Sequence, residues 1–533
     1  MGAVAERIHS PETAVRDIAR AVTIAVTQRR TVVFSMPLDF QRAEVGARQL
    51  AELERLEPPS VPALPAAAPS AVAQLADLLE RAERPVIVGG RGAAGAVPEI
   101  RRLAELTGAL LTTSAVGRGL FHDDPWHLDV MGGFSTDGAA ELISGADVLV
   151  AFGAALNRWT TRDGTFLRNP TVAQVDDTPA AFGFHYPVDL EVLGDSALTA
   201  KAVADLLEER GTARRVGYRT DDVAEKVAAS LNWSDQEFDD RSEPVDPAQP
   251  GSGRIDPRAL TNAIDALVPM DRVVVPDGGN FNAYPAMHLR VPDNRGYCLP
   301  LAFQSIGLAL ASAVGSAVAT PGRVVVAGIG DGGFMMSLVE LDTAVRLSLP
   351  LVVVVYDDNA YSAEVHHFVH ETDRLETVVF PDTDLAAIAR GFGCEGIVVR
   401  SVEDLEPLRD WLEGRRPAPS SSTPRSRSSR PGCSRTASPS TSESSADRPP
   451  GDGDLAAPAL PRTAGGYTAS EPEGDVVGLT VRATSSPRAG SSSTEIRWVG
   501  RATLMAAMGC GPVTKKGAAA ARISGLRSPR FRA

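Results

Sequence analysis

Cysteine is scarce in this sequence, which has only four among 533 residues. No two of them form a CxxC pair, and the four lie too far apart along the chain for a dense disulfide framework. This spacing excludes the common zinc-binding and disulfide-stabilised classes and indicates a reducing compartment. The first residues also lack the basic and apolar segments of a secretory signal, so we expect a cytoplasmic protein.

Basic residues are fewer than acidic ones: the sequence has 53 Lys and Arg residues and 67 Asp and Glu residues, which gives a net charge of −14. Such a balance argues against a general basic surface, so an anionic ligand would need a local site. One stretch, 298–320, runs 23 residues without a charge, but its Gly, Ala and Ser content indicates a buried helix rather than a membrane span. We therefore predict neither a nucleic-acid partner nor a membrane partner.

Large apolar residues are missing from 417–450, which contains no Val, Ile, Leu, Met, Phe, Tyr or Trp. Residues 417–533 carry 16 basic and 8 acidic side chains, so this tail is basic whereas 1–416 is strongly acidic. A segment without apolar side chains cannot bury a core, and the short apolar runs near 476–481 and 496–499 are too scattered to form one. We predict a disordered, low-complexity tail.

Helical and strand patterns alternate along the rest of the chain, in 69–210 and again in 255–416. This alternation predicts an α/β fold class with two doubly wound parallel-sheet domains. Residues 1–45 contain one amphipathic helix and one strand, too little for a domain. The Pro- and Ala-rich segment 46–68 and the polar segment 211–254 are predicted to be linkers.

A glycine-rich segment, Gly90-Arg91-Gly92-Ala93-Ala94-Gly95, follows a predicted strand and precedes a predicted helix. Its spacing matches a dinucleotide-binding turn, which would make the protein an NAD-binding dehydrogenase. That fold also needs an acidic residue at the end of the next strand, and the segment 110–114 has none. We interpret these glycines as turn residues and keep the dehydrogenase as a weaker alternative.

The most informative pattern begins at Gly330-Asp331-Gly332-Gly333 and ends at Asp357-Asp358-Asn359. Each part follows an apolar strand, and a helix lies between them. If the two strands are neighbours, their carboxylates meet at the carboxyl edge of the sheet, where such folds bind ligands. Oxygen ligands at this edge suit Mg²⁺, which completes its shell with phosphate oxygens. The alternative is that Asp331 only caps a helix and Asp358 only belongs to a turn.

This pattern resembles the diphosphate and magnesium signature of thiamine diphosphate enzymes of the acetolactate synthase and benzoylformate decarboxylase type. The sequence has GDG, 24 intervening residues and then two aspartates where the family usually has two asparagines. The flanking segments 340–344, 349–350 and 360–361 agree with the family as well. The resemblance covers about 11–416, with 69–210 similar to the central domain and 255–416 similar to the diphosphate-binding domain.

The resemblance implies a role for each matching residue. Asp331, Asp358 and the backbone carbonyl of Ala360 would bind Mg²⁺, with Asn359 as an alternative ligand if the register shifts by one. The glycine motif would approach the diphosphate, and a bulky apolar residue would support the bent cofactor. The residues assigned to the cofactor in this way are Gly279, Asn280, Ile306, Gly330, Gly332, Gly333 and Asn359.

The helix predicted after 361 carries Glu364, His366, His367 and His370. The spacing of His366 and His370 would allow a pair of metal ligands, but no third ligand is evident. Because the family places substrate contacts on this helix, Glu364 and His367 are the candidates for the substrate pocket.

The family activates its cofactor with a glutamate from an N-terminal, pyrimidine-binding domain. Residues 1–45 resemble only a remnant of that domain, and no segment resembles the strand that carries the glutamate. These departures, and the one near 417, predict a misassigned start and a change of reading frame. We therefore expect a homo-oligomer, or a full-length or separate partner that supplies the missing pyrimidine-binding domain.

The function implied is thiamine diphosphate- and Mg²⁺-dependent decarboxylation or carboligation of a small 2-oxo acid. The alternative is a catalytically incompetent relative that lacks the activating glutamate. The segment 152–157 is loosely similar to a stretch near the flavin of FAD-containing relatives, and this leaves FAD binding open.

Overall fold

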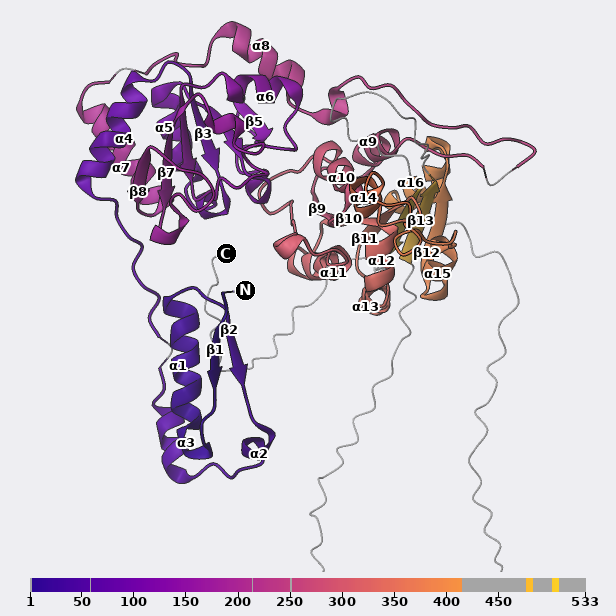
Figure 1. Ribbon diagram of the computed structural model, residues 1–533, viewed down its shortest axis with the longest axis horizontal. Helices are drawn as coiled ribbons and strands as arrows, with labels where there is room; N and C mark the ends of the chain where they lie inside the picture. The colour runs from indigo at the N-terminus through magenta and orange to yellow at the C-terminus, as the bar shows by residue number, and fades with distance from the viewer. Residues whose placement is uncertain are drawn as a thin grey trace, which may run out of the picture. The chain divides into compact units, whose positions relative to one another are not determined.

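The computed structural model describes residues 2–414 except 58, 213 and 250–251, together with the backbone of 476–482 and 501–507. The chain divides into a first unit, Met1–Phe238 with Ala286–Leu299, and a second unit, Asp239–Pro285 with Pro300–Ala533 (Figure 1). Each unit contains one six-stranded sheet, and we call these the first sheet and the second sheet. The α/β class with parallel sheets is thus confirmed.

The N-terminal part of the first unit is a two-stranded parallel sheet of β1 (Val4–Arg7) and β2 (Val32–Ser35). The helix α1 (Ala14–Thr27) connects the strands, and α2 (Leu38–Gln41) and α3 (Ala47–Glu54) follow. The strand β1 and the helix α3 were not expected, since α3 falls in the predicted linker 46–68. Both elements are short, so each contains too few residues for a hydrophobic pattern to distinguish it from irregular structure.

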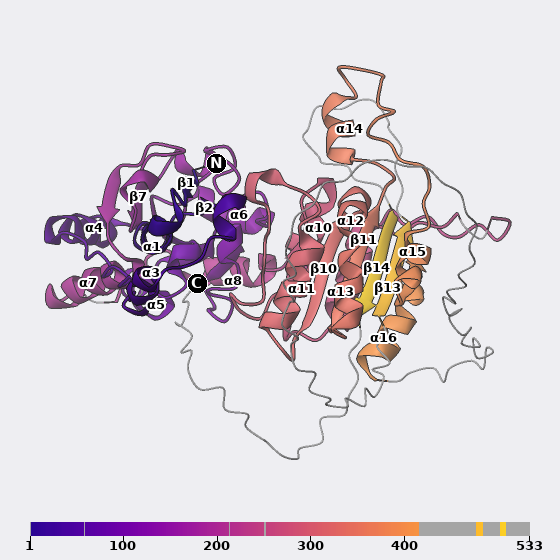
Figure 2. The same cartoon turned by 90° about the horizontal axis from the view of Figure 1, so that it is seen from below.

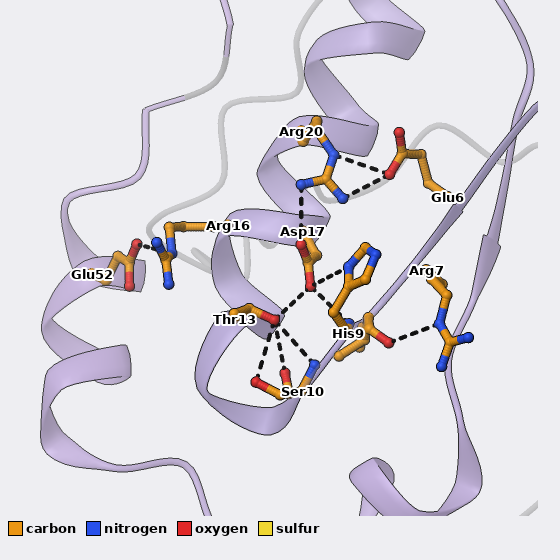
Figure 3. A network of polar contacts seen from close by, with 10 residues as sticks. Glu6, Arg7, His9, Ser10, Thr13, Arg16, Asp17, Arg20 and Glu52 are labelled. Carbon is orange, nitrogen blue, oxygen red and sulfur yellow. Dashed lines mark hydrogen bonds and ion pairs between the residues drawn. The ribbon is translucent and has the colours of Figure 1, made fainter.

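A buried carboxylate fixes the start of α1 (Figure 3). Asp17 accepts hydrogen bonds from the His9 backbone N–H at 2.9 Å and from the Thr13 hydroxyl at 2.7 Å, and it pairs with Arg20 at 3.1 Å. Burial alone would raise the pKa of Asp17, but these donors outweigh it and hold the pKa well below its ordinary value.

The first sheet has the strand order β5-β4-β3-β6-β7-β8, with every neighbouring pair parallel. Its central strands are buried on both faces, which explains why they read as continuous apolar runs. Its strands are β3 (Pro85–Gly89), β4 (Leu110–Thr113), β5 (His127–Val130), β6 (Val148–Phe152), β7 (Thr171–Asp176) and β8 (Leu190–Leu193). Its helices are α4 (Pro69–Arg81), α5 (Val97–Thr107), α6 (Asp137–Ser144), α7 (Ser196–Glu209) and α8 (Asp221–Ser230).

The helix α8 lies within 211–254, which the sequence predicted as a linker. Its residues Val223 and Val227 are buried in the same apolar cluster as Leu142 and Ile143 of α6. The helix α8 is therefore packed into the first unit, which extends to Phe238, whereas 239–254 belongs to the second unit. The many polar residues around these two valines hid the amphipathic pattern.

The second sheet contains three neighbouring parallel strands, β9 (Arg272–Pro276), β10 (Val324–Gly330) and β11 (Leu351–Asp357). Helices pack around them (Figure 2), and the single helix expected between the two aspartate motifs is divided in two. The remaining elements are α9 (Pro257–Leu267), α10 (Ala283–His288), α11 (Ala309–Ala319), α12 (Asp331–Ser337), α13 (Glu340–Arg346), α14 (Ser362–Phe368), α15 (Leu385–Gly391), β12 (Cys394–Val399) and α16 (Glu406–Leu412).

Two further strands of this sheet come from the region predicted to be disordered. They are β13 (Val476–Arg482) and β14 (Arg501–Ala507), which lie between β12 and β11. The expectation of disorder therefore differs from the structure for 476–482 and 501–507, because the backbones of both segments pair with neighbouring strands of the sheet. The apolar run 496–499 lies outside the described residues. The rest of 417–533 lies outside the described residues.

No helix within the described residues is long and apolar enough to cross a membrane. The charge-free stretch 298–320 forms α11 only over its last part, where Ala309, Leu310 and Ala313 are buried. The cytoplasmic location stays a prediction.

Candidate functional site

The candidate site lies where β10 and β11 end. The two strands are parallel neighbours, and their register pairs Gly330 with Tyr356. The next residue on each strand is an aspartate, so Asp331 and Asp357 leave the sheet side by side. The strands are adjacent because both are buried β-branched runs that need neighbours on each side.

Asp331 connects the two loops that follow these strands. Its Oδ1 accepts the Gly332 N–H at 2.7 Å, and its Oδ2 accepts the Ala360 N–H at 3.1 Å. Asp358 lies in the same loop as Ala360 and accepts a hydrogen bond from the Ser362 hydroxyl. The structure thus brings together Asp331, Asp358 and Ala360, the three residues that the sequence assigned to a metal.

The carboxyl groups of Asp331, Asp357 and Asp358 lie close together and are largely shielded from solvent, so their negative charges repel one another. Burial raises the pKa of Asp331 well above its ordinary value, and the nearby charges of Asp358 and Asp357 raise it further. Burial also raises the pKa of Asp358, with a further rise from Asp357, although the Ser362 hydroxyl opposes the shift. A divalent cation would relieve this repulsion, and oxygen ligands of this kind suit Mg²⁺.

Within the described residues, no three His, Cys, Asp or Glu side chains are arranged as a ready metal site. The expected set has only two carboxylates and one backbone carbonyl. A cation with so few protein ligands would complete its shell with water or phosphate oxygens, as Mg²⁺ usually does.

Two glycines in the turn after β10 leave no room for a side chain. A Cβ on Gly332 would lie 2.3 Å from the Tyr361 ring, and a Cβ on Gly333 would lie 2.5 Å from Oδ2 of Asp277. Both positions therefore need glycine for close packing, which keeps the backbone of this turn free of side chains.

The end of β9 contributes a second loop to the site. Gly279 has a φ of +130°, a conformation that favours glycine. The Nδ2 atom of Asn280 is buried and has no hydrogen-bond partner among the described residues. Ile306 is half-buried near this loop, since its Cγ2 lies 3.1 Å from where Gly278 would carry a Cβ. An unsatisfied buried donor in the loop after β9 fits an anionic ligand such as a diphosphate.

The candidates for a substrate pocket lie on α14, whose first residue, Ser362, is hydrogen-bonded to Asp358. Glu364 and His367 are exposed on α14, which Figure 2 shows standing apart from the sheet. The structure gives no hydrogen bond between either side chain and the described residues around Asp331. His366 and His370 are exposed as well.

Three residues of the site were not identified from the sequence: Asp277, Asp357 as a source of charge, and Tyr361 as the neighbour of Gly332. A signal for Asp277 was present, because Asp277-Gly278-Gly279 repeats the strand, aspartate and glycine order of the main motif. Tyr361 had no such signal, since its position depends on how the loop after β11 folds.

The glycines after β3 have a structural explanation. A Cβ on Gly90 would lie 2.1 Å from the Gly153 carbonyl oxygen, and one on Gly92 would lie 2.9 Å from the Gly153 Cα. These residues allow the ends of β3 and β6 to approach closely. Near this edge, a cavity of about 410 Å³ is lined by Asn157, Arg158, Trp159, His185 and Tyr186.

Comparison with known proteins assigns both units. Residues 72–203 match the family model described as "Thiamine pyrophosphate enzyme, central domain", and 277–418 match "Thiamine pyrophosphate enzyme, C-terminal TPP binding domain". The second match begins at Asp277, directly after β9, and contains Asp331 and Asp358.

Several curated proteins are similar to this chain. A sulfoacetaldehyde acetyltransferase of Roseovarius nubinhibens is 30% identical over 350 residues, which cover 61% of this chain and 57% of that protein. "Acetolactate synthase 2, chloroplastic" of Zea mays is 26% identical over 344 residues, covering 62% and 52%. An acetolactate synthase large subunit of Parasynechococcus marenigrum is 29% identical over 329 residues, covering 60% and 51%. The chain thus spans little more than half the length of these relatives.

Proposed function

Because this chain is a member of the thiamine pyrophosphate enzyme family, we propose that the carboxyl edge of its second sheet binds thiamine diphosphate together with Mg²⁺. One observation carries the proposal. Asp331 reaches from the end of β10 to the loop after β11, where its Oδ2 accepts the Ala360 N–H, and the buried Asp331 lies close enough to Asp358 for their charges to interact.

The donor set of the site fits both groups. The carboxylates of Asp331 and Asp358 and the carbonyl of Ala360 would hold Mg²⁺, and Asn359 is the alternative ligand. The Asn280 amide, which lacks a partner among the described residues, would donate to the diphosphate. The glycines of both loops, Gly279, Gly330, Gly332 and Gly333, would let the backbone approach it, and Ile306 would support the rings.

Thiamine diphosphate supplies an electron sink for the decarboxylation of a 2-oxo acid. We propose an activity of the acetolactate synthase type, in which the resulting carbanion passes to an acceptor or to a proton. The names of the similar proteins support transfer chemistry of this kind, because they include acetyltransferases and acetolactate synthases. Glu364 and His367 stay the candidates for substrate contacts.

The activating glutamate expected from the resemblance is assigned to no residue of the described chain. We propose that a full-length relative or a separate partner supplies it, so that the active form is an oligomer. The alternative is a relative that binds the cofactor without turning over substrate. Turnover of pyruvate, measured with and without a candidate partner, distinguishes these two proposals.

Calorimetric titration tests the binding part of the proposal. Thiamine diphosphate is expected to bind the full chain in the presence of Mg²⁺ and to lose most of its affinity when the metal is removed by a chelator. A parallel titration with NAD tests the dehydrogenase alternative. Binding of NAD without binding of thiamine diphosphate would overturn the assignment.

A further inference from the structure

Asp277 is a buried carboxylate at the end of β9 that the assigned ligand set does not use. Its side chain is fully buried, and it has no basic partner among the hydrogen bonds described for it. Instead, Oδ2 accepts the Gly307 N–H at 2.7 Å and Oδ1 accepts the Leu308 N–H at 3.2 Å. Both of its oxygens are thus held by the backbone of one distant turn.

This turn is the start of α11, a helix of 11 residues. Helix N-termini have backbone N–H groups without partners inside the helix, and a capping side chain usually satisfies them. The N-cap residue of α11 is Leu308, which has no side-chain cap. Asp277 therefore caps α11 from a neighbouring strand.

The capped turn carries Ile306 next to Gly307. Gly307 has a φ of +78°, a conformation that glycine adopts without strain but does not enforce, so a contact from outside the turn can select it. The hydrogen bond from Gly307 to Asp277 is such a contact. It sets the position of Ile306 relative to the end of β9, where Gly279 and Asn280 lie.

Asp277 also lies against the other loop of the site. Its Oδ2 occupies the space that a side chain on Gly333 would need, at 2.5 Å from the position of that Cβ. The Gly333 carbonyl oxygen, in turn, lies 3.3 Å from the Cβ position of Gly307. One carboxylate thus lies where the ends of β9 and β10 and the start of α11 meet.

We propose that Asp277 is a positioning residue for the cofactor. By capping α11, it fixes the turn that places Ile306 against the rings of thiamine diphosphate, and it acts on affinity through that residue rather than by touching the metal. This inference rests on the function proposed above.

The test is the dissociation constant of Mg²⁺–thiamine diphosphate for the full-length Asp277→Asn variant. Asparagine keeps the size of the side chain but turns one acceptor into an NH₂ group that faces a backbone N–H. We expect affinity to fall by about tenfold to a hundredfold, as for the loss of a buried hydrogen bond to a charged group. An unchanged dissociation constant would overturn the proposal.

Asp265→Asn is the matched control. Asp265 is also buried in the second unit, but it pairs with Arg272 at the opposite end of β9. This variant is expected to lower the melting temperature, because it weakens a buried ion pair. It should leave the dissociation constant unchanged within about twofold, because that ion pair lies at the end of β9 that is distant from the site. Equal losses of affinity in both variants would mean that Asp277 acts only through stability.

Leu308→Pro gives an independent variant if Asp277→Asn does not fold. It removes the Leu308 N–H donor and leaves the Gly307 N–H donor in place; Leu308 has a φ of −93°, so proline there requires a backbone change of about 30° at the N-cap. The Leu308 side chain is largely exposed, so little packing is lost. A fall in affinity of about threefold to tenfold is expected, and no change would count against the proposal.

A double-mutant cycle with Ile306→Ala tests the route of the effect. If Asp277 acts through Ile306, Asp277→Asn must cost less affinity in the Ile306→Ala background than in the wild type. Additive losses would overturn that route. Failure of the proposed function is a separate result, since the wild-type chain would then not bind Mg²⁺–thiamine diphosphate at all.

Discussion

The two sheets end in glycine-rich turns that are alike in sequence but differ in what surrounds them. After β3, Gly90 and Gly92 pack against the backbone of Gly153, so the turn closes on the neighbouring strand. After β10, the glycines pack against Tyr361 and Asp277, and three further aspartates follow nearby strands. A glycine-rich segment at the end of a strand therefore indicates close packing of the backbone in both sheets. The acidic residues around the segment after β10 are what distinguish a candidate ligand site from the packing seen after β3.

The largest effect that would sharpen this comparison is expected for Asp331→Ala. Mg²⁺–thiamine diphosphate should bind at least about 100-fold more weakly, because a direct ligand should matter at least as much as the outer partners of a metal, whose loss costs roughly 10–100-fold. Calorimetry of the full chain measures this. The control is Asp342→Ala, which removes an exposed acid of α13 paired with Arg346. Equal binding by Asp331→Ala would refute the assigned site.

A pair of glycine variants compares the two turns directly. Gly90→Ala and Gly332→Ala each place a Cβ within 2.3 Å of another atom, so each should lower the free energy of unfolding by about 1–3 kcal/mol. Only Gly332→Ala should also weaken cofactor binding, by about tenfold. Thermal melts and titrations of both variants measure the two effects. A similar loss of binding in Gly90→Ala would break the distinction between the turns.

Gly95→Ala serves as the control for both variants. A Cβ at Gly95 would have no neighbour within 4 Å, so stability should change by less than about 0.5 kcal/mol. A large loss of stability in this variant would show that the packing described around these glycines is incomplete.

The sequence predicted the α/β class and the meeting of Asp331 with the loop after β11, because strand patterns and parallel neighbours follow from local rules. It did not predict the cap of α11 by Asp277, which depends on two segments about 30 residues apart folding together. It also missed α8, whose burial comes from packing on α6 rather than from a strong pattern of its own. The periodicity of apolar residues can be recognised within one segment of the sequence. A contact between two helices or strands depends on both segments and cannot be recognised from either one alone.

A smaller effect, on the free energy of unfolding, is expected from a comparison of two buried carboxylates in different surroundings. Burial would raise the pKa of both groups, but hydrogen-bond donors around Asp17 lower its pKa, whereas burial and then the neighbouring acids raise the pKa of Asp331. Asp17→Asn should therefore lower the stability of the N-terminal part by about 1–3 kcal/mol at neutral pH. Hydrogen exchange of the α1 backbone amides measures this loss.

The sign of the pH dependence follows from the lowered pKa of Asp17. Its contribution is fully present above the pKa of the unfolded chain, about 3.9, and is lost as the pH falls through the lower pKa of the folded state. Wild type and Asp17→Asn should therefore converge in strong acid. Arg16→Gln, which removes an exposed pair with Glu52 at 3.6 Å, should change stability by less than about 0.5 kcal/mol.

The smallest effect on binding is expected for Asp358→Asn, which restores the residue type usual in the family. Asparagine keeps an oxygen for the metal but removes one charge from the acidic cluster. The metal-free chain should melt at a higher temperature, because less repulsion is buried, while Mg²⁺–thiamine diphosphate should bind less than about tenfold more weakly. Melting curves with and without Mg²⁺ test both parts. If this variant lost as much affinity as Asp331→Ala, the charge of Asp358 rather than its oxygen would hold the cation, and the second sheet would differ from its relatives in how it binds metal.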